Sequence, residues 1–176
     1  DPRYPRDRLT LMLEIARPAF VLTQKKLVTN LPASNTLCLD DPDLRLVNEP
    51  TINPRPEATS DDLIYVIFTS GSTGVPKMTG VYHRSFVSLV QWYLSEFTFV
   101  AADRNLVVTS LSFDLTQKNY FAPLLVGGSL SLAPDDGFDP TRISTLIAEH
   151  HVSLLNCTPS AFYPLVQQEE HTPRNL

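Results

Sequence analysis

The run from Tyr65 to Lys77 limits most strongly what this chain can fold into. It opens with Tyr-Val-Ile-Phe, a short β-branched and aromatic stretch that is typical of a buried strand. A loop of hydroxyl residues and glycines follows, and the run closes on a lysine. Glycine permits positive φ angles, and successive backbone N–H groups in such a turn form a concave anion site. With four hydroxyl donors and a cation added, the run predicts a loop that holds the phosphates of a nucleotide.

The predicted phosphate-binding residues are Thr69, Ser70, Gly71, Ser72, Thr73, Gly74 and Lys77. The loop differs from the common P-loop, in which a lysine follows the second glycine directly and a helix opens at once. Here Val75 and Pro76 intervene, and the residues after Lys77 indicate a strand. A P-loop NTPase is therefore disfavoured, while an ordinary Gly/Ser turn that binds nothing stays open as the alternative.

Composition excludes several classes of protein. A chain of 176 residues with 43% hydrophobic content can bury one core, or a core with a small satellite. The net charge of −5 disfavours nucleic acid or an anionic membrane as a partner. We find no signal peptide and no apolar run near the roughly 20 residues that span a bilayer. We expect a cytoplasmic protein and, because Asp1 is not an initiator methionine, one cut from a longer chain.

The first 60 residues predict a small N-terminal piece and a connection. An amphipathic helix is expected over Arg6–Arg17, from apolar residues at three- and four-residue steps. The other expected elements are short strands at Ala19–Leu22 and Thr36–Leu39 and a helical turn at Lys25–Thr29. The stretch Asp40–Ser60, rich in proline and acids, is expected to be a linker.

From Asp61 onward, strands and helices alternate, and residues 61–176 are expected to form one subdomain. Strands are predicted at Ile64–Thr69, Lys77–Val81, Leu106–Thr109, Ser129–Leu132 and Leu154–Asn156. Helices are predicted at Arg84–Phe97, Gln117–Val126, Thr141–His150 and Ser160–Gln168. This alternation predicts an α/β fold, a mostly parallel sheet with flanking helices. The aromatic residues Phe86, Trp92, Tyr93 and Phe97 are expected to pack in its core, because an acidic chain is a poor base-stacking surface.

Asp114 forms a second candidate site, near the C-terminal end of a predicted strand. Ligands of open α/β sheets gather outside that end of the strands. A carboxylate at this position can cap a helix, bind a metal ion or anchor a cationic group of a substrate. The residues by themselves leave these three roles open.

Four motifs together resemble the adenylate-forming, AMP-binding superfamily, and most closely the amino-acid adenylation domains of nonribosomal peptide synthetases. The phosphate run is similar to the family pattern Y-x-x-x-T-S-G-S-T-G-x-P-K-G, with Met78 in place of the final glycine. The opening Asp1–Leu9 is similar to D-P-x-Y-P-x-x-R, and His83-Arg84 matches an H-R pair. Phe113-Asp114 matches the family's F-D substrate motif. The resemblance covers essentially the whole chain and implies part of the large N-terminal core of such an enzyme.

The resemblance implies that an amino acid is activated with ATP and Mg²⁺ and then loaded onto the phosphopantetheine thiol of a carrier protein, beside condensation domains. Asp114 would receive the α-ammonium of the amino acid. Leu115, Lys118 and Asn156 would face its side chain. A lysine in that position implies an acidic or polar substrate, and the alternative is that Lys118 is a solvated surface residue.

The resemblance is partial. The family's adenine motif, its ribose-binding aspartate and its C-terminal catalytic lysine are not found before Leu176. We expect this chain by itself to form no adenylate and to be a piece of an active synthetase. The alternative is a truncated, non-catalytic remnant that serves as a structural or docking element.

Overall fold

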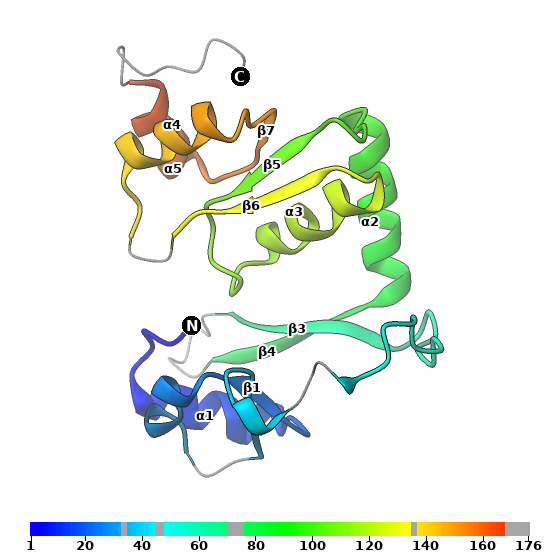
Figure 1. Cartoon of the computed structure of the whole chain (residues 1–176), viewed down its shortest axis with the longest axis vertical. Helices are drawn as coiled ribbons and strands as arrows, with labels where there is room; N and C mark the ends of the chain where they lie inside the picture. The colour runs from blue at the N-terminus through cyan, green and yellow to red at the C-terminus, as the bar shows by residue number, and fades with distance from the viewer. Residues whose placement is uncertain (33–34, 45–47, 70–75, 135–136, 168–176) are drawn as a thin grey trace. The chain divides into compact units, whose positions relative to one another are not determined.

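The computed structural model describes residues 1–32, 35–44, 48–69, 76–134 and 137–167 (Figure 1). The chain divides into two compact units, Asp1–Gly80 and Val81–Leu176. The sequence predicts a different division, after Ser60, between two pieces of an adenylation core. That division stays a prediction. Within the described residues, no helix combines the length and the apolar character needed to cross a bilayer.

The first unit is built from short elements. They are α1 (Arg6–Ala16), β1 (Val21–Thr23), the 3-10 helix η1 (Lys25–Asn30), β2 (Thr36–Cys38), the 3-10 helix η2 (Pro42–Leu44), β3 (Leu63–Thr69) and β4 (Lys77–Tyr82). β1 and β2 pair in parallel, and β3 pairs with β4 in a separate two-stranded sheet. β4 runs across the boundary between the two units. None of the described residues of Asp1–Gly80 is buried.

The second unit holds a layered α/β structure. Its elements are α2 (His83–Glu96), β5 (Arg104–Val107), α3 (Asp114–Leu125), β6 (Ser129–Leu132), α4 (Pro140–Glu149), β7 (Leu154–Leu155) and α5 (Pro159–Val166). β5 lies between β6 and β7 and pairs in parallel with both. The prediction of a parallel sheet with flanking helices is therefore confirmed.

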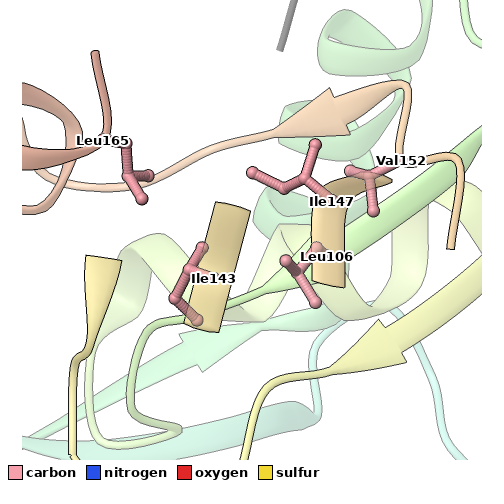
Figure 2. Packing of buried hydrophobic residues seen from close by; sticks show 5 residues of the cluster. All are labelled: Leu106, Ile143, Ile147, Val152 and Leu165. Carbon is pink, nitrogen blue, oxygen red and sulfur yellow. The ribbon is translucent and has the colours of Figure 1, made fainter. Parts of the chain in front are cut away.

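Successive residues of β5 point to opposite faces of this sheet, as the pleat requires. The Asn105 side chain donates to the backbone carbonyl of Asn119 on α3, at 2.8 Å. The next side chain, Leu106, is 1% exposed and packs against Ile143 and Ile147 of α4. Figure 2 shows these apolar side chains gathered with Val152 and Leu165. Helices thus cover both faces of the sheet, with one apolar cluster on the α4 side and further buried apolar residues, Phe86, Val90 and Ala122, on α2 and α3.

Most element boundaries differ from the sequence prediction by one or two residues, and the start of α3 differs by three. β5 begins at Arg104, two residues before the predicted start, and α3 begins at Asp114, three residues before. Arg104 and Asn105 pair with β6 and so belong to β5. Their polar side chains do not fit the apolar pattern from which the strand was predicted. In α3 an acidic residue in the first turn favours the helix, because the N–H groups there carry partial positive charge.

Candidate active site

The two ends of the predicted phosphate loop lie together in the structure. Thr69 ends β3 and Lys77 begins β4, and the Thr69 hydroxyl donates to the Lys77 carbonyl at 3.4 Å. Lys77 is exposed. The predicted loop residues Ser70, Gly71, Ser72, Thr73 and Gly74 lie outside the described residues. An exposed lysine and a hydroxyl residue therefore flank the loop, and its phosphate contacts stay a prediction.

The strand after the loop accommodates Met78, which stands where the family motif has a glycine. Met78 continues β4 as regular strand and is 44% exposed. Gly80 lies against the partner strand, where an added Cβ would come within 2.9 Å of Leu63 Cδ2. A larger residue at position 80 would force the Leu63 side chain to move. The glycine in this region thus serves the packing of β3 on β4.

Asp114 is fixed by the hydrogen bonds of the first turn of α3. The Thr116 side chain is fully buried, and its hydroxyl donates to the Ser110 carbonyl at 2.7 Å. The Gln117 amide donates to the Leu111 carbonyl at 2.8 Å. These two bonds tie the segment that follows β5 to the start of the helix. Because loop and helix are tied together, the position of Asp114 at this edge of the sheet is well defined.

The Asp114 carboxylate is exposed to solvent. Its Oδ1 atom accepts the backbone N–H of Leu115 at 2.7 Å. The cap position itself is held by Phe113, whose side chain makes no capping hydrogen bond, so the interpretation of Asp114 as the N-cap is wrong. No group of three His, Cys, Asp or Glu side chains suited to a metal ion occurs among the described residues. An exposed carboxylate at a helix start remains able to bind a cationic group.

Lys118 lies one helical turn after Asp114 and is half-buried, so it is not a freely solvated surface lysine. Its ammonium donates to the Leu115 carbonyl at 3.2 Å and lies 5.2 Å from the centre of the Tyr93 ring, within cation–π range. Burial lowers the pKa of Lys118, and the negative charge of Asp114 partly opposes this shift. The Leu115 side chain is also half-buried.

Asn156 directly follows β7 and belongs to a closed ring of hydrogen bonds. Its side-chain amide donates to the Tyr93 hydroxyl at 3.1 Å, and that hydroxyl donates to Asn119 Oδ1 at 3.5 Å. Asn119 Nδ2 closes the ring by donating to the backbone carbonyl of Asn156 at 3.2 Å. Burial raises the pKa of Tyr93, against the effect of the bond from Asn156. Since Lys118 lies over the same tyrosine, the structure brings Lys118 and Asn156 to one side chain.

A cavity of about 430 Å³ opens beside this ring. Its lining residues are Tyr93, Phe97, Leu154, Leu155, Asn156, Cys157, Pro159, Phe162 and Tyr163. Of the predicted substrate residues, Asn156 lines this cavity, whereas Asp114, Leu115 and Lys118 do not. Its volume falls within the range of small-molecule sites, and its wall is mainly aromatic and aliphatic.

Sequence reasoning missed the polar ring. Tyr93 and Phe86 are buried, as predicted, but the Tyr93 hydroxyl belongs to the ring as well as to the core. Trp92 and Phe97 are 53% and 54% exposed, so the prediction that they lie in the core is wrong. Asn119 was not recognised from the sequence, because its place on the buried face of α3 depends on the tertiary fold.

Comparison with known proteins agrees with this geometry. The family model described as AMP-binding enzyme matches residues 1–175. The chain is 37% identical over 171 residues to tyrocidine synthase 3 of Brevibacillus parabrevis, covering 95% of this chain and 3% of that protein. It is 36% identical to a dimodular nonribosomal peptide synthase of Bacillus subtilis (strain 168), covering 98% of this chain and 8% of that one.

A solved structure gives the same result. The nonribosomal peptide synthetase FmoA3 (S1046A) superposes with a TM-score of 0.85 at 31% identity, over 96% of this chain and 18% of that one. An AMPPNP-bound form of FmoA3 matches with a TM-score of 0.84. The chain therefore belongs to the AMP-binding enzyme family. Within the family it is similar to the N-terminal part of the adenylation domain of nonribosomal peptide synthetases.

Proposed function

We propose that this chain is part of an adenylation domain that activates an amino acid with ATP, within a longer peptide synthetase. The observation that carries the proposal is Asp114, an exposed carboxylate held at the start of α3 by a buried threonine. It lies beyond the C-terminal end of the central strand of a parallel sheet, where α/β proteins bind ligands. The match to the AMP-binding family over residues 1–175 supports a nucleotide as the second substrate.

The proposed reaction has two steps. In the first, a carboxylate oxygen of the amino acid attacks the α-phosphorus of ATP, the bond to the bridging oxygen breaks, and pyrophosphate leaves. In the second, a carrier-protein thiolate attacks the acyl carbon of the aminoacyl adenylate, the bond to the phosphate oxygen breaks, and AMP leaves. Catalysis of such transfers consists mainly of positioning and charge stabilisation.

We assign the phosphate contacts to residues 69–74 and Lys77. Lys77 supplies a positive charge at one end of the loop, and the Thr69 hydroxyl lies at the other end, bonded to the Lys77 carbonyl. Glycines and hydroxyl groups between them are suited to oligophosphate oxygens. When bound, Mg²⁺ would neutralise part of the phosphate charge. Mg²⁺ usually binds through substrate phosphates with few protein ligands, which agrees with the lack of a three-ligand cluster in the described part of this chain.

We assign the amino acid to the second unit. Asp114 would bind the α-ammonium through a charge-assisted hydrogen bond, the kind of contact that is worth roughly 1.5–3 kcal/mol. Leu115, Lys118 and Asn156 would contact the side chain. The acceptor of the activated acid would be the phosphopantetheine thiol of a carrier protein, and a condensation domain would act next in the same assembly.

Amino-acid-dependent exchange of pyrophosphate into ATP tests this proposal. The full-length protein that contains this sequence is expected to exchange with one or a few amino acids. A Lys77→Ala variant should lose at least roughly 100-fold in rate. The matched variant Lys26→Ala, at another exposed lysine of the first unit, should behave as the wild type. The 176-residue chain by itself should be silent. Silence of the full-length protein with every amino acid would favour the non-catalytic remnant.

A further inference from the structure

Asp114 and Lys118 lie one turn apart on α3, and the acidic residue is the one nearer the start of the helix. An acidic residue four positions before a lysine is the favourable order for an ion pair on a helix surface. Among the described residues, however, these two side chains form no ion pair, although Asp114 is near enough to oppose the lowered pKa of Lys118. The expected pair is replaced by other contacts of the lysine.

Those contacts come from the ring of Tyr93 and from the backbone of α3. The Lys118 ammonium lies 5.2 Å from the centre of the Tyr93 ring and donates to the Leu115 carbonyl at 3.2 Å. The face of an aromatic ring attracts a cation, and more strongly where the two groups are partly removed from water. Lys118 is half-buried. The two contacts together therefore hold the ammonium at Tyr93, a residue of α2.

Tyr93 is itself fixed in place. Its side chain is 5% exposed, and its ring lies 5.0 Å from the ring of Phe99 between centroids. Its hydroxyl donates to Asn119 Oδ1 at 3.5 Å and accepts from the side-chain amide of Asn156 at 3.1 Å. Because packing and hydrogen bonds both restrain the ring, it is a rigid anchor for the lysine.

The Asp114 carboxylate is left available by this arrangement. Its Oδ1 atom accepts the N–H of Leu115 at 2.7 Å, and its Oδ2 atom has no hydrogen-bond partner among the described residues. A lysine paired with this carboxylate would neutralise its charge and would repel a second cation that approaches it. The place at which Lys118 is held thus decides whether Asp114 presents its full negative charge.

We propose that Tyr93 is a positioning residue, which holds Lys118 away from Asp114 and so keeps that carboxylate available to the α-ammonium of the amino acid. Tyr93 acts through Lys118 and needs no contact with the substrate. This inference rests on the proposed function, because it takes Asp114 as the group that binds the ammonium. It adds to that site a residue of α2 that none of the sequence motifs contains.

Exchange kinetics of the full-length protein test the inference. Tyr93→Leu removes the ring and lets Lys118 pair with Asp114, so the KM for the amino acid should rise at least about threefold while the KM for ATP stays unchanged. In a Lys118→Met background, the same change should raise the KM for the amino acid less than about 1.5-fold, because no lysine is left to pair. An equal rise in both backgrounds would show that Tyr93 only fills space and would overturn the inference.

Phe86→Leu is the matched control for lost packing. It shortens another aromatic side chain of α2, one that is 4% exposed, and should leave the KM for the amino acid unchanged. Tyr93→Met, which fills more of the space of the ring with a flexible apolar chain, takes the place of Tyr93→Leu if that variant does not fold.

A second measurement needs no turnover. The pH dependence of acylation by acetic anhydride, followed by mass spectrometry, gives the pKa of Lys118. Asp114→Asn should lower this pKa more in the Tyr93→Leu variant than in the otherwise wild-type protein, because only there does the lysine pair with the carboxylate. Equal effects would overturn the inference. Silence of exchange with every amino acid would remove the proposed function, and the acylation then decides alone whether Tyr93 holds Lys118.

Discussion

The two units of this chain differ in how they are held together. In Val81–Leu176, a three-stranded parallel sheet has Leu106 buried against helix α4, and an amide and hydroxyl network is buried on its other face. In Asp1–Gly80, none of the described side chains is buried, and the four strands form two separate pairs. A two-stranded pair is marginally stable without a packed face. The second unit thus carries the stabilising core, and the first carries short elements around the predicted phosphate loop.

The two units are therefore suited to different parts of the proposed reaction. A rigid site for an amino-acid side chain needs side chains whose positions are set by packing, and only the second unit supplies these among the described residues. A loop that closes on phosphates needs glycine and hydroxyl groups more than a packed core. The proposed division of the substrates, with ATP phosphates at the first unit and the amino acid at the second, follows from this contrast.

The largest expected effect is on stability. Leu106→Ala removes a side chain that is 1% exposed from the core of the second unit and should lower the free energy of unfolding by about 2–5 kcal/mol. Leu22→Ala, on a β1 side chain that is 63% exposed, should change it by less than about 0.5 kcal/mol. Urea unfolding followed by circular dichroism measures both. Equal costs would show that the two units do not differ as described.

Each unit contains one free cysteine, and the pair gives a smaller, local probe of the same contrast. Burial raises the pKa of Cys157, which lines the cavity, so its thiol should react with iodoacetamide more slowly than a free cysteine. In the full-length protein, the activated amino acid should slow the labelling of Cys157 several-fold and leave Cys38 unchanged. Mass spectrometry of the labelled peptides measures both rates. Protection of Cys38 and not Cys157 would place the amino acid at Asp1–Gly80 and contradict its assignment to the second unit.

The smallest expected effect is a pH dependence from Lys118. Burial lowers its pKa below 10.5, so in the range between the two values the unfolded chain binds more protons than the folded chain. From this residue, the free energy of unfolding should therefore rise with pH through that range. The raised pKa values of Cys157, Tyr93 and Tyr120 act in the opposite sense, so the contribution of Lys118 is read from the difference between the wild type and a Lys118 variant. In urea titrations, the free energy of unfolding should rise less, or fall more, with increasing pH for Lys118→Met than for the wild type, and equal slopes would contradict a half-buried ammonium.

Much of the fold followed from the sequence, because strand and helix periods alternate clearly after Asp61. The strand Ser129–Leu132 has the predicted bounds. The prediction was poorer where polar residues lie inside elements, as at Arg104 in β5 and Asp114 in α3. Arg104 belongs to β5 because it pairs with β6, and the start of α3 is held by a hydrogen bond from the buried Thr116 hydroxyl. A local sequence pattern shows neither contact.

The candidate site was predictable only in part. Asp114 and Asn156 were named from motif resemblance, and both lie beyond the C-terminal ends of neighbouring parallel strands. The ring that joins Asn156 to Tyr93 connects residues 63 positions apart in the chain. Such a contact depends on how α2 and the end of β7 come together in the fold. No spacing in the sequence could reveal it.

The central claim is that Lys77 contacts ATP and Asp114 contacts the amino acid. Steady-state exchange kinetics of the full-length protein test this claim most directly. Asp114→Ala should raise the KM for the amino acid at least roughly tenfold and change the KM for ATP little, because it loses a charge-assisted bond to the α-ammonium. Lys77→Ala should lower the rate and raise the KM for ATP. Glu149→Ala, at an exposed carboxylate of α4, is the control and should match the wild type. An Asp114→Ala variant with an unchanged KM for the amino acid would contradict the account.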